Sequence, residues 1–285
     1  GDWVNNTDTL NVNDTPLVSQ LRENSTKTFG VMASTVTDIG ATSTFRTGLR
    51  AETVDDKFSG SSTPAGARHR YIDLIGGTTA KLYTGTLGYD FTPVDSLLVD
   101  VGLKAEHRDA KSNGTYTDTQ AAPTPQSEVS RSSENALTPA LNLNYSGFRS
   151  VALYASASHR YSSGSHDYAT GAGLVVPAVP QFALSPQSDN GDYKVGATWR
   201  QSDLLTLRAE VFYKDHQFKS AGFRSTTTSA YYLLGSRFGG ATISAAVIPI
   251  DTLTFATRYT CQEGDMQVTV SALTSIDSMD ASMQT

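Results

Sequence analysis

The sequence has little of several things that soluble enzymes and binding proteins commonly use. It contains one cysteine, Cys261, in 285 residues, which excludes an internal disulfide framework, a CxxC metal site and a CxxCH haem site. Charged residues make up 18% and hydrophobic residues 38% of the chain, and both fractions are low for a soluble enzyme. The net charge of −6 gives no broad basic field, so we expect no nucleic acid partner.

Sequence motifs for catalysis and for metal binding are missing as well. No apolar run approaches the roughly 20 residues of a membrane-spanning helix. The chain has no Walker loop, no GxSxG motif and no histidines at metal-ligand spacing, so we expect neither an enzyme nor a cofactor or metal site. We expect His107 and His159 to lie at loop rims, and Cys261 to be a small buried side chain.

The feature that is present is a hairpin that recurs about every 54 residues. Short polar turns are expected at residues 38–41, 91–95, 146–149, 201–203 and 249–252, and one residue from each (38, 92, 147, 201 and 250) gives intervals of 54, 55, 54 and 49. A sustained period of this size indicates a repeated supersecondary unit. Segments rich in Gly, Ser, Thr and Pro, at about 57–76, 111–131, 165–190 and 220–228, are predicted to be long loops on the opposite side.

The strands after the turns alternate apolar and polar residues, which is the period of a β-strand. In 97–108, for example, Leu97, Val101 and Leu103 share one face, while Lys104 and Glu106 share the other. The apolar runs last about 9–12 residues, which matches a tilted strand across a bilayer core and exceeds the usual soluble strand of about 5–6 residues. A membrane barrel is therefore favoured over a soluble β-sandwich or β-solenoid.

Aromatic residues on the apolar face support the membrane interpretation. Tyr89, Tyr145 and Trp199 each precede a short turn, and Tyr161 and Tyr213 lie at the far ends of their strands. Aromatic rings with a polar tip favour the membrane–water boundary, so these residues are predicted to form two interfacial girdles.

The turn-plus-strand segments 88–100 (GYDFTPVDSLLVD) and 247–255 (VIPIDTLTF) resemble those of bacterial outer-membrane β-barrels of the porin type. The resemblance covers about residues 27–273 and implies an antiparallel up-and-down transmembrane barrel in the outer membrane. The chain is also similar to the barrel sheaths that hold multihaem cytochromes, although it lacks the N-terminal CxxC that those often carry.

The predicted organisation is a polar extension at 1–25, barrel strands with long outer loops at 26–275, and a polar loop at 276–285. Ten strands are expected, with an eleventh candidate at Met266–Leu273. Single-chain bacterial barrels normally have even strand numbers, and the porin-type terminal aromatic is missing at Gln284-Thr285. We therefore expect part of a larger barrel of 12 or more strands that continues beyond Thr285.

The polar face carries the candidate functional residues. A charged ring in a pore biases which ions pass, and this face has five more basic than acidic residues, which suggests anion preference. The alternative is that most of these charges pair across strands. The basic residues are Arg46, Arg50, Lys104, Arg108, Arg160, Lys194, Arg200, Arg208, Lys214 and Arg258, and the acidic ones are Glu52, Asp90, Asp100, Glu106 and Glu210.

The function that these patterns favour is a porin-like channel for small polar or ionic solutes. The alternatives are a barrel sheath or anchor, for a partner such as a multihaem cytochrome or a surface filament, and a soluble extracellular adhesive β domain. The expected partners are membrane lipid and lipopolysaccharide, with a homo-oligomer or a barrel partner protein as further candidates.

Overall fold

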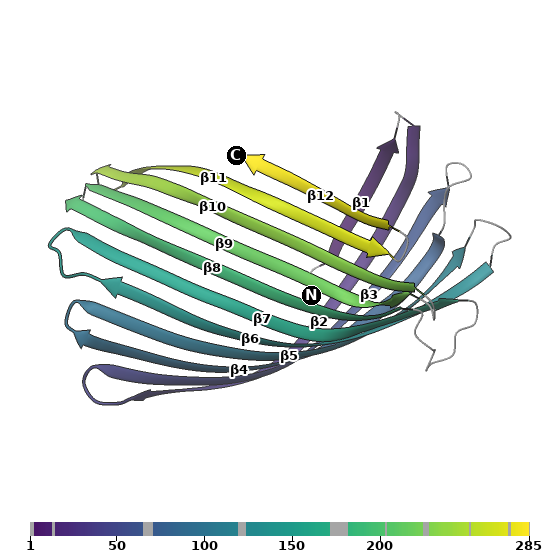
Figure 1. Cartoon of the computed structure of the whole chain (residues 1–285), viewed down its shortest axis with the longest axis horizontal. Helices are drawn as coiled ribbons and strands as arrows, with labels where there is room; N and C mark the ends of the chain where they lie inside the picture. The colour runs from purple at the N-terminus through teal and green to yellow at the C-terminus, as the bar shows by residue number, and fades with distance from the viewer. Residues whose placement is uncertain are drawn as a thin grey trace.

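The protein forms one antiparallel β-sheet in a computed structural model (Figure 1). The structure describes residues 3–12, 15–64, 71–118, 124–171, 182–202, 204–224, 228–250, 252–272 and 275–284, with side chains described for 24–59, 75–117, 125–169, 185–202, 204–220, 233–250 and 252–267. Twelve strands pair in chain order, each with the next. The predicted all-β, antiparallel, up-and-down architecture is therefore confirmed. Within these residues, no helix is long and apolar enough to cross a membrane.

Strands β2 to β11 have 20–24 residues each, whereas the edge strands β1 and β12 have 10. The strands are β1 Trp3–Val12, β2 Thr15–Asp38, β3 Ser43–Pro64, β4 Tyr71–Val94, β5 Leu97–Asp118, β6 Thr124–Tyr145, β7 Val151–Gly171, β8 Phe182–Ser202, β9 Leu205–Arg224, β10 Thr228–Ile250, β11 Leu253–Ala272 and β12 Ser275–Gln284.

The pairing register repeats every 54 residues. Thr35 opposes Thr47, which places the axis of the first hairpin at residue 41. The axes of the next hairpins, found in the same way from their opposed residues, lie at 95, 149, 203 and 251. The first three intervals are 54 residues and the last is 48, so the period expected from the turns is also the period of the hydrogen-bonded ladder.

Backbone hydrogen bonds join the short turns to one another in the same register. The amide N–H of Thr92 donates to the Thr42 carbonyl at 2.9 Å, and Ser146 donates to Ser96 one repeat later at 2.7 Å. The first turn also contains Gly40, whose φ of +79° lies in the left-handed region that glycine adopts without strain. The turns therefore form a continuous hydrogen-bonded edge.

The register gives the sheet an odd-numbered face and an even-numbered face. Directly opposed residues of an antiparallel pair share a face. From β2 to β11 the opposed residues have the same parity, apart from a few pairs beside bulges. Away from the bulges, the odd-numbered side chains that the structure describes therefore point to one side, as in the row Phe45–Tyr89–Val101–Leu141.

The odd face carries an apolar band. We define it as the odd-numbered residues of 29–37, 45–53, 83–91, 97–105, 137–145, 151–157, 193–199, 205–213, 239–247 and 253–261; none of them is Asp, Glu, Lys or Arg. Beyond the band the odd face becomes polar, with charges directly next to it at Lys81, Asp215 and Arg237 and one position further at Asp109. A nine-residue segment is roughly 26 Å long at about 3.3 Å per step.

The sheet has no hydrophobic core in the described part. Its buried apolar residues are Val99 and four alanines, and no large side chain there is fully buried. Twenty-five of its thirty-five exposed large apolar side chains are odd-numbered. A single layer of strands therefore leaves its apolar face uncovered, which is the opposite of a soluble sandwich.

The even face is concave. Backbones two strands apart are roughly 9.6 Å apart, yet Arg46 of β3 contacts Asp100 of β5, and Tyr154 of β7 contacts Glu210 of β9. Among the described side chains, contacts on the odd face join only neighbouring strands or residues of one strand. The sheet in Figure 1 is accordingly curved, with β1 and β12 at its two edges.

The strands differ from expectation in extent. The predicted polar extension at 1–25 contains β1 and the first part of β2, and the predicted loop at 276–285 contains most of β12. The eleventh candidate strand, Met266–Leu273, overlaps the end of β11, so the count is twelve. Strands also occupy most of the segments predicted to be long loops.

The reason lies in where the hydrophobic alternation ends. Past the apolar band the regular apolar–polar alternation stops. Ser59-Gly60-Ser61-Ser62 therefore has a loop-like composition although it belongs to β3. The ladder continues there because each backbone group still pairs with the neighbouring strand, whatever the side chain.

Candidate functional site

All thirteen residues predicted to face a pore lie on the concave even face. Their positions follow from the register, since each opposes another even-numbered residue or lies two residues from one that does. That this face lines a pore stays a prediction. The residues are Arg46, Arg50, Asp100, Lys104, Glu106, Arg108, Arg160, Lys194, Arg200, Arg208, Glu210, Lys214 and Arg258.

Charged and polar side chains of the even face are connected in three parts, which together we call the charged lattice. The first part centres on Arg46 of β3. Its Nη2 donates to Asp90 Oδ1 at 2.7 Å and to Asp100 Oδ1 at 2.9 Å. Asn142 of β6 donates to the other oxygen of Asp100 at 3.2 Å. The guanidinium passes over Gly88 of β4, where an added Cβ would lie 3.4 Å from its nitrogens. One arginine thereby connects β3, β4 and β5.

The second part centres on Arg160 of β7. Its Nη2 lies 2.9 Å from Glu134 Oε1 on β6, and its Nε lies 3.9 Å from Glu106 Oε2 on β5. Lys104 lies 3.1 Å from the same oxygen of Glu106. A separate pair joins Arg50 to Glu52 on β3. Every acidic group in this part therefore has a basic neighbour.

The third part joins β7 to β9. The Tyr154 hydroxyl donates to Glu210 Oε2 at 2.7 Å, and Arg208 Nε donates to the Tyr154 oxygen at 2.8 Å. Arg208 also pairs with Glu210 at 3.0 Å and lies over the Tyr154 ring, 4.7 Å from its centroid. The side chain of Glu210 is only 16% exposed, so its charge depends on these partners.

Contacts in all three parts join positions one repeat apart. Arg46 and Asp100 are separated by 54 residues, and so are Tyr154 and Arg208. Glu106 and Arg160 have the same separation. Residues 54 apart occupy equivalent places on strands n and n+2, so the lattice connects each hairpin to the next through the same positions.

Aromatic rings on the even face lie over glycines directly opposite. Tyr154 opposes Gly196, and Phe212 opposes Gly240. A Cβ at Gly196 would be 2.4 Å from Tyr154 ring atoms, and one at Gly240 would be 2.6 Å from the Phe212 ring. Phe238 covers Gly264 in the same way, at 2.3 Å. A ring over a glycine restores packing that the glycine lacks.

These rings help to form a groove along the concave wall. A hollow of about 710 Å³ spans β6 to β11, with Phe212 and Phe238 in its lining. Lys194 and Arg258 also line it, and neither forms an ion pair with a described residue. The groove thus combines aromatic surface with two available cations.

The even face is balanced in charge, and the expected excess of five basic residues is wrong. Its described side chains include ten basic residues, which are the ten given above, and ten acidic ones. The expected set missed five acids that lie in the longer strands. The acidic residues are Asp38, Glu52, Asp56, Asp90, Asp100, Glu106, Glu128, Glu134, Asp192 and Glu210.

Six of the ten basic residues form ion pairs, but only three of them pair across strands, namely Arg46, Arg160 and Lys214. Arg50, Lys104 and Arg208 pair with a carboxylate two residues along their own strand. The expectation that most of these charges pair across strands is therefore wrong. Arg108, Lys194, Arg200 and Arg258 form none with the described residues. Arg108 still acts electrostatically on Glu134, and Lys194 on Glu210.

The predicted interfacial aromatics all lie on the odd face. Tyr89, Tyr145 and Trp199 are near the short turns, where Tyr145 packs edge-on against Phe148 at 5.3 Å. Tyr161 and Tyr213 lie toward the other end of the apolar band. Whether these rows meet a membrane boundary stays a prediction.

Sequence reasoning missed several members of the second row. Tyr193 stacks on Tyr213, with centroids 6.4 Å apart, and His159 stacks on Tyr161 at 4.2 Å. Tyr83 stacks on His107 in the same manner. The histidines expected at loop rims therefore lie within β5 and β7. Their spacing from the turns was visible in the sequence, but the length of the strands was not.

His107 lies just beyond the apolar band, and its hydrogen bonds favour the protonated, charged ring. Its Nδ1 lies 2.8 Å from Asn135 Oδ1 and its Nε2 lies 2.9 Å from Asp109 Oδ2. Both partners are acceptors, so they favour an imidazolium with both nitrogens protonated. The bond to Asn135, followed by the bond to Asp109, raises the pKa of His107 above its usual 6.5.

Cys261 corrects a further expectation. It is exposed, not buried, and it opposes Ala241 on the odd face. Its apolar neighbours are the other residues of the apolar band, and this band is exposed. Among the described residues no group of three or more His, Cys, Asp or Glu side chains could hold a metal ion.

No family model matches the chain, and no curated protein matches it. Among solved structures the chain is similar to the crystal structure of the ferric yersiniabactin uptake receptor FyuA from Yersinia pestis. The TM-score is 0.43 and the sequence identity is 9%. The match covers 88% of this chain and 56% of the receptor chain, so this chain spans just over half the length of that protein.

Proposed function

We propose that this sheet is the wall of a bacterial outer-membrane β-barrel and that its concave face lines a passage for small polar solutes. The observation that carries the proposal is the reversal of the usual distribution of side chains. The apolar band is exposed on the convex face, while the charges form a hydrogen-bonded lattice on the concave face. Lipid-facing apolar and lumen-facing polar positions alternate in this way in membrane barrels.

The dimensions of the band fit this proposal. Nine residues span roughly 26 Å along the strand and about 20 Å across a membrane at a tilt of about 40°. The bacterial outer membrane is thinner than average. The two boundaries of the membrane would then lie at the aromatic rows, at Tyr89 and Trp199 on one side and at Tyr83 and Tyr193 on the other.

A wall in hydrocarbon cannot keep open edges, because unpaired backbone groups cost several kcal/mol each there. We propose that the free edges of β1 and β12 acquire strand partners in the membrane. The balanced even face implies weak ion selectivity, since opposite charges cancel the field along the wall. This replaces the anion preference suggested by the sequence.

A second candidate is a sheath around another protein. The observation that favours it is the aromatic groove beside Phe212 and Phe238, which offers packing surface on the concave side. A filled barrel would be closed to ions although its convex face still met lipid.

Single-channel recording in planar lipid bilayers separates these functions. We expect stepwise conductance and a reversal potential near zero in a salt gradient. A protein that inserts and resists SDS unfolding unless heated, yet remains silent, would support the sheath. A chain that stays monodisperse without detergent would contradict both.

A further inference from the structure

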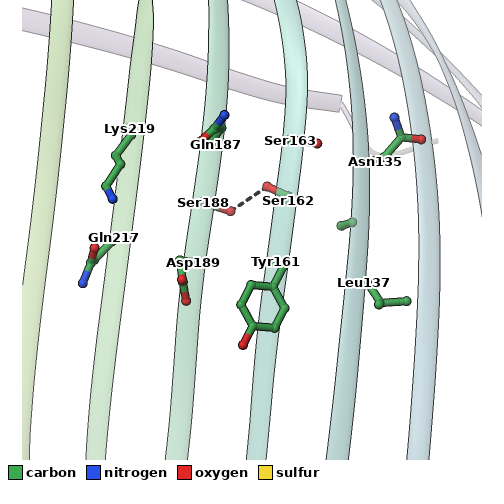
Figure 2. A pocket seen from close by; sticks show the side chains of 11 residues that line it. Asn135, Leu137, Tyr161, Ser162, Ser163, Gln187, Ser188, Asp189, Gln217 and Lys219 are labelled. Carbon is green, nitrogen blue, oxygen red and sulfur yellow. Dashed lines mark hydrogen bonds between the residues drawn. The ribbon is translucent and has the colours of Figure 1, made fainter.

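A hollow of about 470 Å³ lies on the convex face, at the edge of the apolar band that is farther from the short turns. Figure 2 shows its lining on neighbouring strands, in two rows across the sheet. The upper row runs through Asn135, Ser163, Gln187 and Lys219, which oppose one another in register. The hollow is thus a feature of the paired sheet itself.

The walls of the hollow change from apolar to polar away from the band. Leu137 belongs to the band and Tyr161 opposes it, and both are exposed, at 45% and 50%. Gln187 and Lys219 lie one step further from the band. A molecule in this hollow would meet an apolar wall at one end and hydrogen-bond donors at the other.

The donors at the polar end are available. Among the described residues, Lys219 forms no ion pair, and neither Gln187 nor Tyr161 makes a side-chain hydrogen bond. The one carboxylate in the lining, Asp189, is already engaged by His159. Two further lining side chains have partners on this face: Asn135 bonds His107 at 2.8 Å, and Gln217 Nε2 donates to Asp215 Oδ1 at 3.5 Å. The bond drawn in Figure 2 between Ser162 and Ser188, at 2.6 Å, joins even-numbered residues, which face the concave side. The hollow therefore presents an ammonium and an amide without an acceptor of their own.

We propose that this hollow binds the phosphorylated head group of an anionic membrane lipid. The proposal rests on the proposed function, because only a membrane places lipid head groups at this edge of the band. An ammonium group with neighbouring amide and hydroxyl donors suits a phosphate. The acyl chain would continue along Leu137 onto the apolar band, and the volume is within the range of ligand sites.

The test is native mass spectrometry of the full chain released from micelles with equal amounts of phosphatidylglycerol and phosphatidylcholine. We expect the wild type to retain phosphatidylglycerol about fivefold over phosphatidylcholine, the preference that one lysine at an anionic surface provides. Lys219→Gln should reduce the ratio toward one, and Lys219→Arg should keep it. Lys214→Gln is the matched control, since Lys214 is on the same strand but points to the concave face.

Three results would overturn the proposal. The first is equal retention of the two lipids by the wild type, and the second is equal loss of preference in Lys219→Gln and Lys214→Gln. The third is displacement of phosphatidylglycerol by millimolar inorganic phosphate, which would make this a site for free phosphate. Insertion into vesicles, measured in parallel, separates failure of this site from failure of the proposed function: an inserted protein without lipid preference refutes the site alone.

Discussion

Replacing Gly196 with alanine tests whether the concave lattice holds the sheet together. The added Cβ would lie 2.4 Å from the Tyr154 ring and hydroxyl, and 2.6 Å from the backbone oxygen of Ala209. Real Cβ contacts are not that short, so the ring must move. Moving it breaks the Tyr154 contacts with Glu210 and Arg208.

The expected cost follows from the contacts that are lost. A hydrogen bond to a charged group contributes about 1.5–3 kcal/mol, and the bond from Tyr154 to Glu210 is of this kind. The Arg208 contact with the ring adds about 0.5–1 kcal/mol, reduced by solvent because Arg208 is half exposed. Alanine recovers about 0.5–1 kcal/mol relative to glycine in a strand. We expect a net loss of about 2–3 kcal/mol.

Urea unfolding in phospholipid vesicles, followed in a Trp3→Phe background by the fluorescence of Trp199 on the same strand, measures this loss. Gly102→Ala is the matched control on the same face, because a Cβ there comes no closer than 3.9 Å to its neighbours. In a Tyr154→Ala background the cost of Gly196→Ala should fall by at least half, leaving the contact with Ala209. Equal stability of the Gly196 and Gly102 variants would refute the reasoning.

Two other expectations concern the convex face and pH. Leu141→Arg, at the middle of the apolar band, should cost about 2–4 kcal/mol in vesicles, whereas Ala140→Arg on the concave face should cost under about 1 kcal/mol; equal costs would argue against lipid contact. His107 should titrate above 6.5 by NMR, and its hydrogen bonds should stabilise the fold fully below pH 6.5 and cease to do so as pH rises through the folded-state pKa. Asn135→Ala should lower that pKa, and an unchanged value would contradict the assigned bond.

The faces of the sheet could be predicted from the sequence because strand period is a local property. The alternation from Leu97 to Ala105 identifies one side of β5 without knowledge of its neighbours. The length of the strands could not be predicted, because the alternation ends where the apolar band ends. At Ser59-Gly60-Ser61-Ser62 only backbone pairing maintains β3, and composition does not record backbone pairing.

The charged lattice was harder to predict from the sequence, since its contacts depend on the pairing register of the strands. Arg46 and Asp100 were both assigned to the polar face, but their contact across β4 requires the axes of two hairpins. The signal that could have found it is the period itself. Adding 54 to a polar position leads to the residue at the same height two strands away, as from Tyr154 to Arg208.

The 54-residue register makes the wall modular. Each hairpin faces the same way, meets the next through equivalent positions, and joins it by the same bond between turns, as from Thr92 to Thr42. A duplicated or deleted unit would therefore leave inside and outside unchanged while altering the circumference by two strands, or roughly 10 Å. The diameter of the proposed barrel could be changed in steps, by evolution or by engineering, without redesigning either face.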